Sequence, residues 1–255
     1  MKIISVCSFK GGTGKTSIAL NLAKISGIYQ IKTLLWELNK NPGSLSSILN
    51  LDLNKNVFTA IMNPKRLPYC VHKVKDEYFD VLLGPPDAVI GEEIGDIGKL
   101  NEVLYNAKML YDLIILDHGP YMEVLSIQLL NESDYILFII EPDVSCTSNL
   151  NTNLSLIKER ADVDLSNKIK IVLNKYDVFD NINKSQIKDV LGYGVFEKIK
   201  YDNTYRAKIN RLASSIPKSS VLKGCEKIFK KLFPEAKKPK KERGLFKIIK
   251  IKKKK

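Results

Sequence analysis

Hydrophobic residues along the chain fall into short continuous runs that alternate with stretches of helical character. The continuous runs are rich in Ile, Leu and Val and predict buried strands at 2–8, 32–38, 78–84, 111–117, 134–142 and 168–177. A weaker run at 195–202 predicts an edge strand. The helical stretches are 15–25, 43–49, 56–62, 97–111, 123–131, 147–159, 204–213 and 219–233. Because buried strands joined by helices are typical of parallel sheets, we expect an α/β fold, a mostly parallel sheet with helices on both faces.

A glycine-rich segment, "SFKGGTGKTS" at 8–17, follows the first predicted strand and opens the first predicted helix. The common pattern G-x-x-x-x-G-K-[ST] is not met, because Phe9 stands where its first glycine belongs. Clustered glycines still let successive backbone N–H groups turn toward one anion, and the helix N-terminus adds its dipole. The segment therefore predicts a phosphate loop in which Lys15 reaches the β- and γ-phosphates and the Thr16 hydroxyl holds Mg²⁺. The other residues expected to contact the nucleotide are Gly11, Gly12, Thr13, Gly14 and Ser17. The alternative is a surface turn that binds nothing.

The same segment carries a second lysine, Lys10, directly before the glycines. In this form it resembles the deviant Walker A motif, K-G-G-x-G-K-[ST], of the MinD/ParA family of ATPases. The resemblance implies a P-loop NTPase fold of three α/β/α layers, ATP and Mg²⁺ as cofactors, and a homodimer in the ATP state. It also implies a catalytic role for Lys10 beside Lys15, because Lys10 would reach across the dimer to the phosphates of the other subunit. The alternative is an exposed lysine in a lysine-rich chain.

Two further polar residues follow predicted strands, where ligands of parallel sheets bind. Asp117 ends the run "DLIILD" in a Walker B arrangement and can hold a Mg²⁺-bound water opposite Thr16. Asn174 ends "IVLN", and the family resemblance implies that its amide binds adenine. The resemblance includes "IKYD" at 199–202, which implies a position near the base, and it covers residues 1–233. Asp and Asn are also ordinary turn formers, so a structural role is the alternative for each.

The chain departs from the family after the second predicted strand, where the family normally reads D-x-D. Glu37 stands at the first position and Asn39 at the second, within "LLWELNKNPG". Glutamate can accept from metal-bound water, so Glu37 is a candidate metal and catalytic residue. Asn39 can position water but cannot act as a base at neutral pH, and a well-placed base is worth about 10²–10⁴-fold in rate. We therefore expect weak hydrolysis, or hydrolysis that needs a partner; the alternative is that Glu37 supplies the missing function.

Length, hydrophobicity and cysteine spacing narrow the class of protein. A chain of 255 residues, 44% of them hydrophobic, can bury one α/β core, which we expect at 1–233. We expect neither a transmembrane helix nor a signal peptide, since no stretch has the required apolar block. The scattered cysteines form no CxxC pair, which argues against zinc and iron–sulfur sites and fits a reducing cytoplasm.

The net charge of +13 is concentrated near the C-terminus. Residues 234–255 hold eleven Lys or Arg against two Glu and so carry +9 of it. We expect a charged linker at 234–243 and, at 244–255, an amphipathic segment similar to the membrane-targeting helix of MinD-type proteins, which would bind an anionic membrane surface. On a helical wheel its apolar side consists of Leu245, Phe246, Ile248 and Ile249. The alternatives are a solvated lysine-rich terminus and nonspecific binding to DNA.

Together these features predict an ATP-binding, ATP-dependent dimerising switch that positions cargo at the membrane. We expect a cytoplasmic, peripherally membrane-associated protein with a protein activator or cargo that the sequence does not identify. One alternative is a ParA-like partitioning ATPase associated with DNA. Another is a nucleotide-bound scaffold that does not hydrolyse ATP, since Asn39 replaces the expected aspartate.

Overall fold

An eight-stranded sheet forms the centre of the computed structural model, which describes residues 1–39, 43–74, 77–87, 97–120, 124–177, 184–205 and 219–239. The strand order is β3-β4-β2-β5-β1-β6-β7-β8, and all neighbouring pairs are parallel except β3 and β4. The strands are β1 (Lys2–Cys7), β2 (Thr33–Leu38), β3 (His72–Lys73), β4 (Phe79–Leu82), β5 (Leu113–His118), β6 (Tyr135–Ile140), β7 (Ile169–Tyr176) and β8 (Val195–Lys200). All seven predicted strands are confirmed, and β8 lies at the edge as expected.

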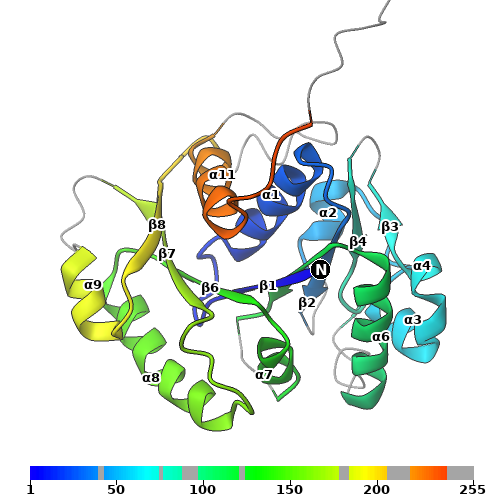
Figure 1. Cartoon of the computed structure of the whole chain (residues 1–255), viewed down its shortest axis with the longest axis horizontal. Helices are drawn as coiled ribbons and strands as arrows, with labels where there is room; N and C mark the ends of the chain where they lie inside the picture. The colour runs from blue at the N-terminus through cyan, green and yellow to red at the C-terminus, as the bar shows by residue number, and fades with distance from the viewer. Residues whose placement is uncertain are drawn as a thin grey trace, which may run out of the picture.

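Helices cover both faces of this sheet (Figure 1). One face carries α1 (Lys15–Ile28), α2 (Leu45–Leu49) and α11 (Ser220–Leu232). The other face carries α3 (Val57–Met62), the 3₁₀ helix η1 (Pro64–Arg66), α4 (Leu67–Cys70), α6 (Ile97–Leu110), α7 (Val124–Asn131), α8 (Val144–Arg160) and α9 (Lys184–Leu191). The expected three-layer α/β/α fold is confirmed.

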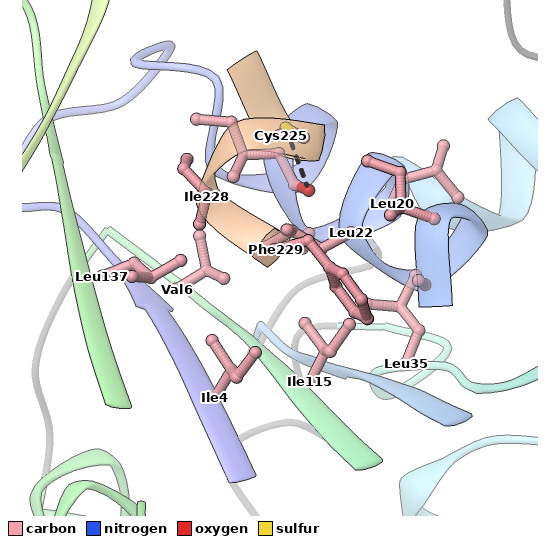
Figure 2. Packing of buried hydrophobic residues seen from close by; sticks show 14 of the residues in the cluster. Ile4, Val6, Leu20, Leu22, Leu35, Ile115, Leu137, Cys225, Ile228 and Phe229 are labelled. Carbon is pink, nitrogen blue, oxygen red and sulfur yellow. Dashed lines mark hydrogen bonds between the residues drawn. The ribbon is translucent and has the colours of Figure 1, made fainter. Parts of the chain in front are cut away.

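Alternate residues of the central strands supply the two layers of core, which explains why these strands read as continuous apolar runs. In β5, Leu113 and Ile115 belong to the cluster under α1, whereas Ile114 and Leu116 belong to the cluster with α6. All four side chains are completely buried. Figure 2 shows the first of these layers, with Ile115 facing the helices that contribute Leu22 and Phe229.

The parallel arrangement brings the carboxyl ends of five strands to one edge, because β2, β5, β1, β6 and β7 are consecutive in the sheet. The pairing register sets Glu37 of β2 beside Asp117 of β5, and Asp117 beside Val6 of β1. Asn174 lies near the end of β7. The strand ends that carry the candidate residues therefore meet at one edge of the sheet.

Three predicted segments lie partly or wholly beyond the described residues. The helix expected at 204–213 is outside them from position 206 onward, and the linker 234–243 is described only as far as 239. The amphipathic segment 244–255 is outside them altogether. None of the helices in the described ranges is long and apolar enough to cross a membrane.

Candidate functional site

The loop between β1 and α1 has a backbone shape suited to binding phosphate. Gly12 and Gly14 lie in the left-handed region, with φ angles of 77° and 94° that other residues rarely adopt. Gly14 is the N-cap of α1 and has no side chain to accept from the first N–H groups of that helix, so these groups suit an anion. Around the loop, Gly11 and Gly12 are exposed, Thr13 is buried, and Gly14, Thr16 and Ser17 are half-buried.

Two consecutive residues near the end of β7 hold this loop in place. The Asn174 amide donates to the Thr13 carbonyl at 2.7 Å, and Lys175 Nζ donates to the Gly12 carbonyl at 2.6 Å. A Cβ at Gly14 would lie 2.5 Å from Asn174 Nδ2, so the close approach requires glycine as well. Asn174 positions the loop in this conformation, and its contact with adenine stays a prediction. Sequence reasoning missed Lys175, because no local pattern shows that its side chain turns back to Gly12.

The stretch 199–202 lies beside the same strand end. The backbone N–H of Tyr201 donates to the Tyr176 carbonyl at 2.9 Å, and Lys198 Nζ lies 4.1 Å from the centre of the Tyr176 ring. These contacts bring the stretch next to the strand that carries Asn174. Its predicted position near the base stays a prediction.

Lys15 and Asp117 are both buried at the base of the loop, where each side chain feels the charge of the other. Burial lowers the pKa of Lys15, and the Asp117 carboxylate partly offsets this change. Burial raises the pKa of Asp117 to about 7. The nearby Thr16 hydroxyl partly offsets this rise in the pKa of Asp117, although it is not placed to form a hydrogen bond with either carboxylate oxygen.

The Asp117 carboxylate is a candidate ligand for a cation. Among the residues that the structure describes, neither of its oxygens has a hydrogen-bond partner, although both are buried. An unpaired buried carboxylate is strongly unfavourable, and oxygen atoms are the ligands that Mg²⁺ prefers. These orphaned oxygens fit the predicted ion, which Thr16 and Asp117 would hold either directly or through water. Bound there, Mg²⁺ would neutralise charge on the phosphate oxygens of a nucleotide.

Glu37 has structural hydrogen bonds in this conformation. Its Oε1 accepts from the Leu45 N–H at 3.3 Å, at the start of α2, and its Oε2 accepts from the Gly84 N–H at 3.2 Å, after β4. Burial raises the pKa of this carboxyl, and the two backbone bonds partly offset the rise. Because both oxygens bind backbone groups, the metal and catalytic roles expected of Glu37 gain no support from its contacts and stay predictions.

Asn39 packs against the loop that follows β5. A Cβ added at Gly119 would lie 3.0 Å from Asn39 Oδ1, so this side chain touches the backbone two residues after Asp117. Asn39 and the Walker B carboxylate thus share one edge of the sheet. The expected catalytic consequence of asparagine at this position stays a prediction.

Lys10 lies at the mouth of the loop, with a side chain that is 40% exposed. Its Nζ lies 2.8 Å from Asp143 Oδ2 and 3.1 Å from Glu141 Oε2, and these hydrogen bonds raise its pKa. Glu141 also binds Lys175 through Oε1 at 2.6 Å. Both carboxylates follow β6, and sequence reasoning missed them; the acidic residues of "EPD", at the end of the strand predicted over 134–142, were the available signal. The cross-subunit lysine implied by the family is thus paired within its own chain.

His118, next to Asp117, belongs to a buried polar chain. Its Nε2 lies 2.8 Å from Ser5 Oγ, which lies 2.8 Å from Ser133 Oγ. Burial lowers the pKa of His118 to about 3, so the imidazole is neutral at ordinary pH. The sequence assigns this histidine no chemistry, and its contacts tie β5 to β1 and to the end of α7.

Comparison with known proteins identifies the family. A family model described as an AAA domain matches residues 1–171. The chain belongs to the MinD/ParA family of P-loop ATPases. Among curated members of the MinD/ParA family, the chromosome partitioning protein ParA of Myxococcus xanthus is 27% identical over 212 residues, covering 78% of this chain and 74% of that protein. The sporulation initiation inhibitor Soj of Bacillus subtilis is 23% identical over 202 residues, covering 75% of this chain and 79% of Soj.

Solved structures of MinD/ParA proteins share the fold. A ParA family ATPase from Chlorobium tepidum has a TM-score of 0.78 at 22% identity, covering 89% of this chain and 98% of the other. The septum site-determining protein MinD of Pyrococcus horikoshii, solved in complex with Mg-ADP, has a TM-score of 0.75 at 22% identity, covering 91% and 95%. At this level of sequence identity, the structural similarity shows that the chain has the MinD/ParA fold, and it does not assign the chain a particular cellular role.

Proposed function

We propose that this MinD/ParA-family protein is an ATP-dependent dimerising switch that positions a cargo at an anionic membrane surface. The observation that carries the proposal is the placement of Lys10 at the exposed mouth of a phosphate loop, where carboxylates of its own chain hold it. The loop itself supplies the remaining phosphate contacts through Lys15 and the N-terminus of α1. In this proposal ATP and Mg²⁺ bind at the loop, and Lys10 moves to the nucleotide of a second subunit.

The ion pairs of Lys10 are weak enough to be exchanged. The side chains of Asp143 and Glu141 are 37% and 17% exposed, and partly exposed pairs of this kind are worth about 0–1 kcal/mol. A triphosphate carries more negative charge than either carboxylate. A second subunit that presents its nucleotide can therefore compete for Lys10, which makes dimer formation depend on the presence of the γ-phosphate.

We expect the intrinsic rate of ATP hydrolysis to be low. Asn39 supplies no base at neutral pH, and Glu37 directs both carboxylate oxygens to backbone N–H groups. A protein activator that adds a polar or charged group near Asp117 would complete the site. Slow turnover keeps the dimer assembled until that partner arrives, as a positioning switch requires.

The decisive experiment measures oligomeric state against nucleotide. Wild type, Lys10→Ala and Lys15→Ala are compared by analytical ultracentrifugation with Mg²⁺ and either ADP or a nonhydrolysable ATP analogue. We expect a dimer only for wild type with the ATP analogue. Lys10→Ala should bind nucleotide and stay monomeric, whereas Lys15→Ala should lose nucleotide affinity. A wild-type protein that stays monomeric with saturating analogue would refute the switch.

A DNA-associated partitioning ATPase is the second candidate, and the similarity to the chromosome partitioning protein ParA favours it. Strong retention on duplex DNA that falls steeply with salt, without binding to anionic vesicles, would select this function.

The third candidate is a scaffold that binds ATP without turnover. Absence of phosphate release in the presence of the cognate activator would select the scaffold.

A further inference from the structure

The outer side of α11 exposes lysine alone. Its exposed residues are Lys223, Lys227, Lys230 and Lys231, which are spaced by four, three and one positions and so project from one side of the helix. We call these four residues the lysine face of α11. The opposite side is apolar and completes the core cluster shown in Figure 2, where Ile228 and Phe229 face the sheet.

Packing fixes the direction in which the lysine face points. The Phe229 ring lies 4.8 Å from the ring of Tyr29, at the end of α1. Gly224 lies so close to β8 that an added Cβ would be 2.6 Å from Ile199 Cγ1. These contacts prevent α11 from turning about its axis, so the lysines face away from the sheet.

Two glutamates only partly neutralise this face. Glu197 of β8 lies 2.7 Å from Lys231 and 3.9 Å from Lys227, and Glu226 lies 3.2 Å from Lys230. The side chains of Lys227 and Lys230 are still 68% and 60% exposed. Three of the four lysines thus share two acidic partners, and Glu226 also binds Lys238 at 3.0 Å, so the face keeps a positive charge that is open to solvent.

The lysine-rich composition of the chain does not by itself produce such a face. The exposed residues of α6 include Glu102 and Met109, those of α8 include Glu159, and those of α9 include Asp189. The exposed sides of these three helices therefore carry acidic or apolar residues. Lysine alone is exposed on the helix that leads directly to the basic C-terminal segment.

The path of the chain connects the lysine face to that segment. After α11 the described chain continues along the same side of the molecule to Pro239 (Figure 1). Five positions separate Pro239 from Gly244, the first residue of the predicted membrane-binding segment, and five residues span at most about 18 Å. This distance is about two Debye lengths at physiological salt. Charges two Debye lengths apart are largely screened, so the lysine face can attract lipid phosphates only when α11 itself turns toward a surface bound by 244–255, and the short connection allows this.

We propose that the lysine face of α11 is a second contact with an anionic lipid bilayer and turns this side of the domain toward the membrane. The proposal rests on the proposed membrane role of 244–255 and adds the surface of the folded domain that would follow it. A lysine ammonium is a compact point charge that suits a diffuse layer of lipid phosphates, whereas nucleic-acid sites are typically rich in arginine. The exposed residues of α11 include neither arginine nor an aromatic side chain, and this favours lipid over DNA.

The test is vesicle binding by the full chain carrying Lys223→Gln, Lys227→Gln and Lys230→Gln. The matched control carries Lys55→Gln, Lys65→Gln and Lys73→Gln, three exposed lysines near α3 and β3, so both variants lose the same charge. We expect the first variant to bind vesicles containing 30% phosphatidylglycerol about tenfold to hundredfold more weakly than wild type, and the control to change by less than about threefold. Binding to pure phosphatidylcholine should be weak for all three proteins.

Equal losses in the two variants would overturn the proposal, because net charge alone would then explain the binding. An unchanged vesicle affinity of the lysine-face variant would also overturn the proposal. In that case, loss of binding on truncation of 244–255 would show that the membrane role of the C-terminal segment still holds. If the wild-type protein does not bind vesicles and the lysine-face variant loses affinity for duplex DNA, the partner is nucleic acid and the lipid proposal fails. The dimerisation assay above is independent of all three outcomes.

Orientation can be measured separately. The four natural cysteines are free and buried, so a dye attached through Lys227→Cys or Lys65→Cys labels one chosen site. With brominated lipids in the vesicle, we expect stronger quenching of the dye at position 227 than at position 65. Equal quenching at the two positions would overturn the predicted orientation even if the lysines contribute to affinity.

Discussion

Lys10 has one predicted contact and a different observed one. Its place before the glycines predicts a contact with a second subunit, yet in the described conformation it pairs with Asp143 and Glu141. Asp143 is also the N-cap of α8, where it accepts from the Cys146 N–H at 2.6 Å. The carboxylate therefore anchors a helix and holds the lysine at the same time, and in the proposed switch it would compete for Lys10 with the nucleotide of the second subunit.

Replacing Asp143 by asparagine separates these two roles, because asparagine is as good an N-cap but carries no charge. We expect Asp143→Asn to strengthen the ATP-dependent dimer by about two- to fivefold, the equivalent of one partly exposed ion pair. The dimer dissociation constant, measured by ultracentrifugation with Mg²⁺ and a nonhydrolysable ATP analogue, checks this. Asp189→Asn, at an exposed site on α9, is the control. A weaker dimer in Asp143→Asn would contradict the competition.

Asn39 is the second residue with a testable chemical role. We expect Asn39→Asp to raise the rate of phosphate release at saturating ATP by tenfold or more, toward the limit of about 10²–10⁴-fold that a general base can contribute. Asn39→Ala removes the amide without adding a base and should give no increase. If the aspartate variant turns over at the wild-type rate, then another group limits hydrolysis.

At the scale of elements, the pairing of α11 with β8 depends on close approach. Gly224 faces Ile199 across this contact, and a Cβ at 2.6 Å from Cγ1 of a β-branched side chain cannot be accommodated without a shift. Sequence alone predicts the helix at 219–233, but nothing in its spacing indicates that glycine 224 contacts a strand. The tertiary packing gives this glycine its role.

We expect Gly224→Ala to lower the free energy of unfolding by about 1–2 kcal/mol, since the overpacking outweighs the gain in helix propensity. The urea midpoint measures the change. Gly194→Ala is the matched control, because an added Cβ there meets nothing within 4 Å and the backbone is not left-handed; its stability should change by less than about 0.5 kcal/mol. Equal effects at the two positions would contradict the packing argument.

Element prediction succeeded where hydrophobic runs are long and failed where elements are short. The seven predicted strands each contain at least four residues in the structure, whereas β3 has two and α4 has four. Such short pieces span about one period of hydrophobicity, which is too little to show a repeat, so their conformation comes from neighbours. In the structure α8 also begins three residues before its predicted start, because Asp143 as N-cap, rather than an apolar pattern, begins this helix.

At the scale of the whole molecule, the core that the structure describes consists of residues that precede the basic tail. Within the described ranges, Ala236 is the last hydrophobic residue that packs against the core cluster under α1 and α11. We expect deletion of 244–255 to abolish binding to anionic vesicles while leaving the melting temperature and the ATP-dependent dimer unchanged. Cosedimentation, thermal unfolding and ultracentrifugation of the truncated protein measure these three properties. Undiminished vesicle binding after truncation would remove the tail from the membrane role.

The sequence by itself determined the order along the chain of seven strands and most of the longer helices, and it determined the phosphate loop. Each of these depends on residues within a few positions of one another: the apolar runs set the strands, and the glycines with Lys15 and Thr16 set the loop. Local conformational preferences and hydrophobic periodicity act over this range, so they can be read without a structure.

Only the tertiary structure decided which distant groups meet at that loop. Glu141 and Lys175 reach it because β6 lies beside β1 and β7 lies beside β6 in the sheet, and strand adjacency is not encoded in any short stretch. The contacts of Glu37 and Asn174 also depend on the folded sheet, because Glu37 accepts from the backbone of Gly84 and Asn174 donates to the backbone of Thr13. A hydrogen bond needs two groups within about 3 Å, and only the folded sheet brings residues so far apart in the chain to that distance.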